Sequence, residues 1–212
     1  MEPTKHLSDE LEPSRMGRPR EFDIDRALED AMYVFWSHGY HATSLTDLTE
    51  AMHLKRGSLY AAFGDKHQLF LAAFDRYTDS LVEQTMAAVL EGPGVEIDAL
   101  DALRTYLYEF AQRAVGDSGR RGCFIANTTS EMLPHDPVVH ARITATFQRI
   151  EQLFTNAIRY AQQQGSIRAE CDAPTTARYL LCMVEGLRVV GKTGLSETEV
   201  HALIEITLSA LR

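Results

Sequence analysis

The feature that most constrains this fold is an apolar spacing of three and four residues, which recurs from residue 24 almost to the end of the chain. This spacing gathers apolar side chains on one face of an α-helix, whereas a half-buried strand needs strict alternation. No alternating run of useful length occurs in the sequence. We therefore expect an all-α fold. The predicted helices cover about residues 24–38, 45–52, 56–63, 65–90, 98–115, 124–132, 138–164, 174–193 and 197–210.

Residues that favour helix ends support the first of these boundaries. Asp23 is an expected N-cap, and Ser44 with Asp47 three residues later resembles a capping box. Gly39 and Gly64 follow apolar helical segments and are expected to terminate them. The sequence thus predicts one longer helix and two short helices before residue 65.

The composition narrows the classes of protein that the chain can represent. A net charge of -9 argues against a non-specific nucleic-acid coat protein, but a site-specific DNA binder needs basic groups only where it meets phosphate. The three cysteines are odd in number and widely spaced, so no disulfide framework or zinc ribbon is predicted and a reducing compartment is expected. No signal peptide and no apolar run of ~20 residues is present, which predicts a soluble, cytoplasmic protein without a membrane partner.

The two short helices form a helix-turn-helix pattern behind the first helix. A recognition helix must expose small or polar side chains at its N-terminal end, and Arg56, Gly57 and Ser58 fall there. Tyr60 can place its phenol on a phosphate oxygen. The side chains expected to hold this helix from behind are Leu54, Leu59 and Phe63. This arrangement predicts a surface that reads double-stranded DNA.

The stretch from Thr43 to Leu69, TSLTDLTEAMHLKRGSLYAAFGDKHQL, resembles the DNA-binding signature of the TetR family of repressors. The preceding helix, with Gly39-Tyr40 near its end, also matches, and the rest of the chain is similar in size and helicity. The matching positions are Thr43, Leu48, Ala51, Leu54, Gly57, Leu59, Tyr60, Phe63, Lys66 and Leu69.

The chain also departs from the family pattern within this stretch. His53 stands in the inter-helix turn where the family usually has Gly, and it must tolerate positive φ there. Lys55 stands where a Ser or Thr commonly caps the recognition helix, and Ala61 and Ala62 replace residues that are often aromatic or His. These departures bear on the DNA contacts more than on the fold.

The resemblance implies a three-part organisation and a homodimer that binds a palindromic operator. Residues 1–20 are expected to form a flexible arm, 21–66 the helix-turn-helix domain and 67–212 the ligand-binding and dimerisation domain. The two recognition helices are expected to enter major grooves ~34–36 Å apart. The arm carries two arginines that lie either along a narrow minor groove or in solvent. The residues expected to contact DNA are Arg18, Arg20, Thr43, Ser44, Lys55, Arg56, Gly57, Ser58, Tyr60 and Lys66.

The last two helices of the family pair with their symmetry mates, and two apolar stripes here fit that role. The alternative is that both stripes belong to the core of a single chain. The first stripe comprises Leu180, Leu181, Val184 and Leu187, and the second comprises Val200, Leu203, Ile204, Thr207, Leu208 and Leu211.

A small-molecule inducer is expected to bind among the helices after residue 66, although the same aromatic and Met side chains also suit a plain core. Cys123, Asn127 and Glu131 are spaced four residues apart and should share a helix face. Cys123 also follows two arginines at a helix start, which should lower the pKa of its thiol and suit an electrophile or oxidant sensor; the alternative is a small buried apolar side chain. The expected ligand-binding residues are Tyr106, Phe110, Cys123, Asn127, Glu131, Phe147, Met183 and Arg188.

No cofactor, metal or catalytic site is predicted. His135, between Pro134 and Pro137, and the nearby His140 have acidic neighbours, but they suit solvated positions better than a metal site. The sequence contains no G-x-S-x-G, P-loop or H-E-x-x-H motif, which argues against an enzyme. We therefore expect a dimeric repressor that a small molecule releases from its operator. The alternatives are an activator of the same fold and a helical interaction protein that does not bind DNA.

Overall fold

The computed structural model describes residues 22–90, 98–113, 115 and 120–212. Within them, every regular element is helical, which confirms the predicted all-α class. The arm at residues 1–20, with Arg18 and Arg20, lies outside the described residues. The elements are α1 (Ile24–His38), α2 (Leu45–Ala51), α3 (Arg56–Phe63), α4 (Lys66–Leu90), α5 (Ala99–Gln112), α7 (Phe124–Met132), α8 (Pro137–Gln164), α9 (Ala173–Val190), the 3₁₀ turn η1 (Gly191–Thr193) and α10 (Glu197–Ser209).

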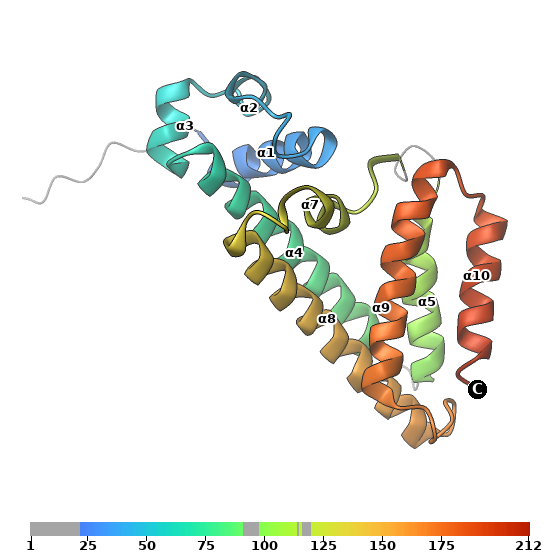
Figure 1. The fold of residues 1–212 in the computed structure, drawn as a ribbon. Coiled ribbons are helices and arrows are strands. Elements are labelled where there is room, and N and C mark those ends of the chain that lie inside the picture. The colour runs from blue at the N-terminus through green and yellow to red at the C-terminus, as the bar shows by residue number, and fades with distance from the viewer. Residues whose placement is uncertain (1–21, 91–97, 114, 116–119) are drawn as a thin grey trace, which may run out of the picture.

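Helices α1 to α3, which we term the head, pack together on the first turns of α4 (Figure 1). Phe35, Leu48, Leu59 and Phe70 are fully buried and form the centre of this unit. The Asp23 carboxylate accepts hydrogen bonds from two backbone amides at the start of α1. Ser44 and Asp47 form the predicted capping box of α2. Local capping and burial of one face per helix together set the order of these three elements.

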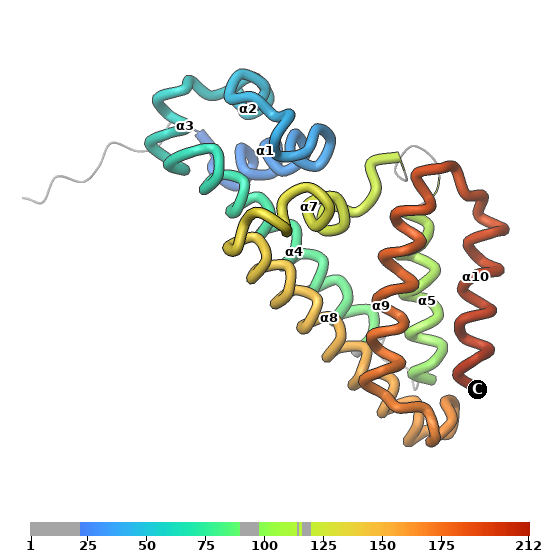
Figure 2. The backbone as a smooth tube through the Cα atoms, viewed as in Figure 1, coloured from blue at the N-terminus to red at the C-terminus, as the bar shows by residue number. Residues whose placement is uncertain are grey.

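Helices α4 to α10, which we term the body, form a bundle in which α4 and α8 run side by side (Figure 2). Helix α9 packs against α8 and α5, and α10 packs against α5. The short helix α7 lies between the head and the rest of the body (Figure 1). Helix α4 therefore belongs to both units, because its first turns pack on the head and its later turns pack on α5 and α8.

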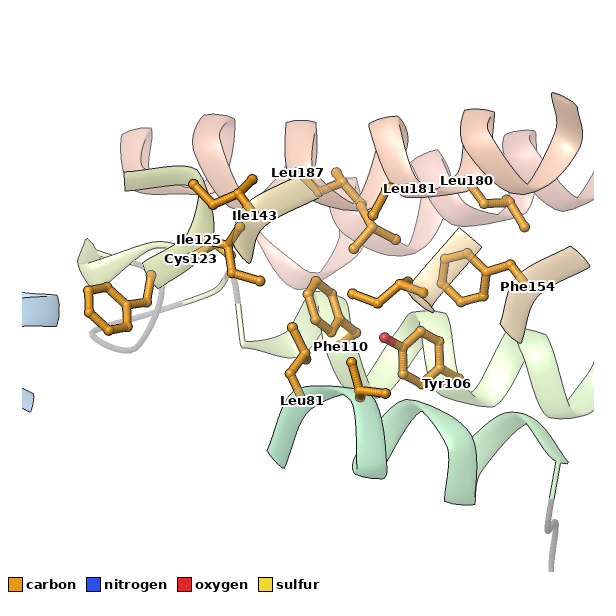
Figure 3. Close-up of a cluster of buried hydrophobic side chains, with 14 of the residues drawn as sticks. Leu81, Tyr106, Phe110, Cys123, Ile125, Ile143, Phe154, Leu180, Leu181 and Leu187 are labelled. Carbon is orange, nitrogen blue, oxygen red and sulfur yellow. The ribbon is translucent and has the colours of Figure 1, made fainter. Parts of the chain in front are cut away.

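The two apolar stripes predicted to form the dimer interface are instead core of the single chain. Figure 3 shows Leu180, Leu181 and Leu187 of α9 facing Phe110 and Phe154 inside the body. Most of the second stripe is also buried, with Ile204 fully enclosed. The expectation was wrong because helical periodicity identifies the apolar face of a helix but not the element that covers it. The buried residues are Leu180, Leu181, Val184, Leu187, Val200, Ile204, Thr207, Leu208 and Leu211, whereas Leu203 is 40% exposed.

Two predicted helix ends lie a few residues too far along the chain. Helix α5 ends at Gln112 rather than near residue 115, and α9 ends at Val190. The three residues after Val190 form the tighter turn η1, which Gly194 closes with a positive φ of 95°. Among the described residues, no helix combines the length and apolar character that a membrane span requires.

Candidate functional site

The N-terminal end of α3 presents the polar surface that the sequence predicted. Lys55, Arg56 and Gly57 are exposed, and Ser58 is half-buried. Tyr60 is 44% exposed, whereas Leu59 beside it is fully buried against the head. A Cβ atom at Gly57 would meet nothing within 4 Å, so this turn of the helix is open to an approaching partner. The Lys55 side chain makes no capping hydrogen bond at the start of α3.

The turn between α2 and α3 has the positive φ at His53 that the sequence predicted. His53 has a φ of 52°, and it is the one non-glycine residue with positive φ among those described. The His53 amide donates a hydrogen bond to the Glu50 carbonyl at 3.2 Å, and the Leu54 amide donates to the Thr49 carbonyl at 3.0 Å. Histidine thus occupies a left-handed position that glycine would fill at lower cost.

Three predicted DNA contacts have structural roles. Thr43 is 2% exposed, and its hydroxyl donates to the Gly39 carbonyl, so this side chain does not present itself to a partner. The Lys66 ammonium lies 4.5 Å from the centre of the Tyr40 ring, and burial lowers its pKa. Ser44 remains exposed while its hydroxyl caps α2. The sequence signature does not distinguish residues that build the turn from residues that face DNA, which is why Thr43 was misplaced.

Besides the ion pair of Arg76 on α4 with Asp25 on α1, further polar contacts join the head and the start of α4 to the rest of the body. The Trp36 indole Nε1 of α1 donates to the Gly122 carbonyl at 3.1 Å. The Glu131 carboxylate of α7 accepts hydrogen bonds from the backbone amides of Tyr40 at 2.9 Å and His41 at 2.7 Å. His67 Nε2, near the start of α4, lies 2.6 Å from a carboxylate oxygen of Asp136.

Glu131 and Asn127 were predicted to bind a ligand, but both are engaged within the chain. Both carboxylate oxygens of Glu131 are occupied by backbone amides that follow α1. The Asn127 amide donates to the Arg121 carbonyl at 2.9 Å and accepts from the Lys192 ammonium. The i, i+4 spacing was correct, but it does not reveal that Glu131 meets the head and that Asn127 meets Arg121 and Lys192. Neither residue is retained as a ligand contact.

A hollow of about 860 Å³ lies between α1 and α4. Trp36 and Tyr33 of α1, Tyr77 of α4, Arg113 and Arg188 contribute to its walls. A second hollow of about 410 Å³, lined by the predicted ligand residues Tyr106 and Phe110, shares Leu81, Gln84 and Arg113 with the first. Phe147 and Met183 are half-buried on the outside of the core and are not among the lining residues of either hollow.

Buried polar groups gather behind the wall of the larger hollow. The Arg188 side chain is 2% exposed, donates to the Gly122 carbonyl at 2.7 Å and lies 5.1 Å from the centre of the Phe110 ring. The Cys123 thiol lies 3.5 Å from Glu185 Oε1 and 4.0 Å from the Tyr77 hydroxyl.

Two atoms of this group, Glu185 Oε2 and Arg188 Nε, are enclosed without a hydrogen-bond partner in the described part of the chain. Burial raises the pKa of the Glu185 carboxyl. Unpaired buried polar atoms are costly, and a bound molecule with matching groups would relieve that cost. Sequence reasoning missed Glu185, although a charged residue within the apolar 180–187 segment is a signal that could have identified it.

The predicted lowering of the pKa of the Cys123 thiol is wrong. The side chain is fully buried, and burial together with the negative Glu185 carboxylate raises its pKa to about 12. The Arg121 guanidinium lies over the Tyr33 and Trp36 rings of α1, at 5.5 and 5.2 Å from their centres. A small buried apolar side chain is the better description of Cys123. Among the described residues, no group of three His, Cys, Asp or Glu side chains is placed to hold a metal ion.

Comparison with known families assigns both parts of the chain. Residues 27–73 match the family model described as bacterial regulatory proteins, tetR family. Residues 99–205 match the model described as Tetracyclin repressor-like, C-terminal domain. The two matches together take in the head, the start of α4 and most of the body.

Individual proteins match over nearly the whole chain. The HTH-type transcriptional repressor ComR of Escherichia coli (strain K12) is 33% identical over 92% of this chain and 90% of its own length. The uncharacterized HTH-type transcriptional regulator YezE of Bacillus subtilis (strain 168) is 30% identical over 92% of this chain and all of its own. A solved structure of a cysteine mutant of the TetR family regulator CifR, complexed with 26 base pairs of operator DNA, is similar with a TM-score of 0.79 and 32% identity, covering 92% of this chain and 100% of that one.

Proposed function

This chain belongs to the TetR family of transcriptional regulators, and on that premise we propose that it is a dimeric repressor that a small molecule releases from its operator. We assign DNA binding to residues 21–66 and ligand binding and dimerisation to residues 67–212. The observation that carries the proposal is the exposed N-terminal end of α3, where Lys55, Arg56 and Tyr60 face outward from a buried Leu59.

The DNA contacts divide by chemistry. Arg56 and Ser58 lie on the first turn of α3 and can reach base edges in a major groove, where Arg pairs with guanine. Lys55 and Tyr60 suit phosphate oxygens, which set the register of the helix without reading sequence. Gly57 lets the helix backbone come close to the groove wall because no side chain stands between them. The similarity to a regulator solved on operator DNA supports this arrangement.

The proposed dimer uses the faces of α9 and α10 that the core leaves open. Val189 and Val190 are 53% and 51% exposed, and Ile206 is 66% exposed. Tyr179 is a further exposed apolar side chain on α9, and Gly186 between these positions would let two copies of the helix approach closely. Exposed apolar side chains gathered in this way favour burial against a second copy.

The proposed ligand site is the larger hollow together with the smaller one beside it. Arg188, Phe110 and Tyr106 are the predicted ligand residues that line these spaces, and Trp36 and Tyr77 add aromatic walls. Because the larger hollow touches both α1 and α4, a molecule bound there contacts the head and the body at once. An inducer must bind the DNA-incompetent state more tightly by several kcal/mol to empty the operator.

The test is a mobility-shift titration with duplex DNA that flanks the gene of this protein. We expect a salt-dependent shift with the unchanged chain. Arg56→Ala should weaken binding by about 1–3 kcal/mol, and Tyr60→Ala should weaken it at every sequence alike. Arg149→Ala is the matched control, since this exposed arginine lies on α8 and pairs with Asp79.

Three outcomes bear on the proposal. Loss of the shift with Arg56→Ala but not with Arg149→Ala supports α3 as the reading helix. No shift from any flanking duplex at low salt contradicts DNA binding and favours a helical interaction protein. A normal shift with lower transcription of the flanking gene in a deletion strain contradicts repression and indicates an activator.

A further inference from the structure

The Gly122 carbonyl accepts two hydrogen bonds, one from a side chain of α1 and one from a side chain of α9. Trp36 Nε1 of the head donates at 3.1 Å, and Arg188 Nη2 of α9 donates at 2.7 Å. Both donors also line the hollow. A molecule that displaces either side chain therefore changes the second hydrogen bond of the same carbonyl, because the two donors share one acceptor.

The chain at Gly122 leads directly into a buried helix start. Gly122 has a φ of 71°, a left-handed conformation that favours glycine, and the end of the Lys192 side chain lies against it. The next residue, Cys123, is the N-cap of α7 and is fully buried. A shift of the Gly122 carbonyl is thus expected to move the start of α7 instead of being absorbed locally.

The far end of α7 holds the head a second time. The Glu131 carboxylate binds the amides of Tyr40 and His41, directly after the C-cap of α1. A Cβ at Gly39 would lie 2.7 Å from Glu131 Oε2, so the carboxylate is fitted closely against this turn. The turn leads into the N-cap of α2, which begins the helix-turn-helix.

We infer that residues 122–131 form a strut that links the wall of the hollow to the head alongside α4, with Trp36, Arg188 and Glu131 as its positioning residues. The strut is fixed to the head at both ends and to the cavity wall through Arg188. Occupancy of the hollow is then transmitted through α7 to the turn before α2, and so to the angle of α3. This inference rests on the proposed function for its DNA-binding readout but not for its structural readout.

The structural readout is amide hydrogen exchange in the full chain without DNA. Arg188→Met removes the donor to Gly122 from the body side, and we expect the Tyr40 and His41 amides to exchange at least about fivefold faster. The amide of Phe154, whose side chain is fully buried on the inner face of α8, should keep its rate and so report that the fold is intact. Arg104→Met is the matched control, because this arginine also joins two body helices but bonds Asp101 and Glu205 instead.

The result that overturns the strut is unchanged exchange at Tyr40 and His41 in Arg188→Met, or an equal increase in Arg104→Met. If Arg188→Met also speeds exchange at the Phe154 amide, Arg188→Lys replaces Arg188→Met as the test variant, because it keeps the cation and shortens the reach to Gly122. Unchanged exchange at Tyr40 and His41 in Arg188→Lys, or an equal increase in Arg104→Met, then overturns the strut.

The DNA-binding readout is a double-mutant cycle on operator affinity. Trp36→Phe keeps an aromatic ring and removes the indole donor. Because both donors meet at one carbonyl, the double variant with Arg188→Met should depart from the product of the single effects by at least about fivefold. The control cycle of Trp36→Phe with Arg104→Met should be multiplicative within about twofold. If the effects multiply in both cycles, the strut is contradicted. If the unchanged chain does not bind DNA, the proposed function is contradicted, and hydrogen exchange remains as the test of the strut.

Discussion

At the scale of single residues, burial decides the chemistry of Cys123 more strongly than its position at a helix start. A thiol with a pKa of about 12 is almost entirely protonated at pH 8. The thiolate is the reacting species, and its fraction is on the order of a thousandfold lower than for a free cysteine. Iodoacetamide should therefore alkylate Cys123 much more slowly in the native protein than in urea, as measured by mass spectrometry of peptides. Equal rates in the two conditions would restore the reading of Cys123 as a reactive sensor.

Gly39 is a position at which even a methyl side chain should lower the stability of the head. It has a φ of 81°, and any Cβ would press against the Glu131 carboxylate. Gly39→Ala should therefore lower the free energy of unfolding by about 1–3 kcal/mol, measured by urea denaturation. The control for backbone strain alone is the same Gly39→Ala change made in a Glu131→Ala chain, because the φ of 81° and ψ of 172° at Gly39 stay the same while the carboxylate is removed. Equal losses in the two backgrounds would mean that contact with Glu131 contributes nothing.

At the scale of elements, a substitution within α3 should change stability and DNA binding in opposite directions. Gly57 lies inside this helix, and an added methyl group would meet no atom of the chain. Gly57→Ala should raise stability by roughly 0.5–1 kcal/mol, since alanine loses less backbone freedom in a helix. The same methyl group should weaken operator binding by keeping the helix from the groove. Thermal melts and mobility shifts on one preparation measure both effects, and unchanged affinity would remove Gly57 from the interface.

The helices could be predicted well from the sequence because their ends are marked locally. Asp23 caps α1 and the Ser44 box caps α2, and each signal lies within four residues of its effect. The end of α9 was misjudged because its last residues pass into a 3₁₀ turn without a breaking residue before Gly191.

The site was less predictable because its contacts join distant segments. The Gly122 carbonyl meets side chains 86 and 66 residues away, and Glu131 meets an amide 91 residues away. The sequence pattern could place Arg56 and Tyr60 on an exposed helix end, since only local structure was needed. The sequence pattern could not show that Thr43 is buried. It also could not show that Glu131 binds the head or that Glu185 lies beside Cys123, because these contacts depend on how α7 and α9 pack.

At the scale of the whole molecule, the proposed dimer should depend on the exposed faces of α9 and α10. Ile206 is 66% exposed in the single chain, so a charge there would not disturb the core. Ile206→Asp should shift the molecule from dimer to monomer in sedimentation equilibrium, because the carboxylate would be buried unpaired between the copies. Tyr160→Asp is the control, as Tyr160 is an exposed apolar residue on α8. A dimer that survives the Ile206 change would exclude this face as the interface.

The central claim is that two α3 helices read the major groove at two symmetric half-sites. Methylation of guanine N7 places a methyl group in that groove, so interference by this modification tests the claim directly. We predict two clusters of interfering guanines whose centres lie ~10 base pairs apart, related by two-fold symmetry, and weaker interference by Arg56→Ala at one guanine in each cluster. Protein that binds the duplex without any interfering guanine, or with a single unpaired cluster, would contradict the account.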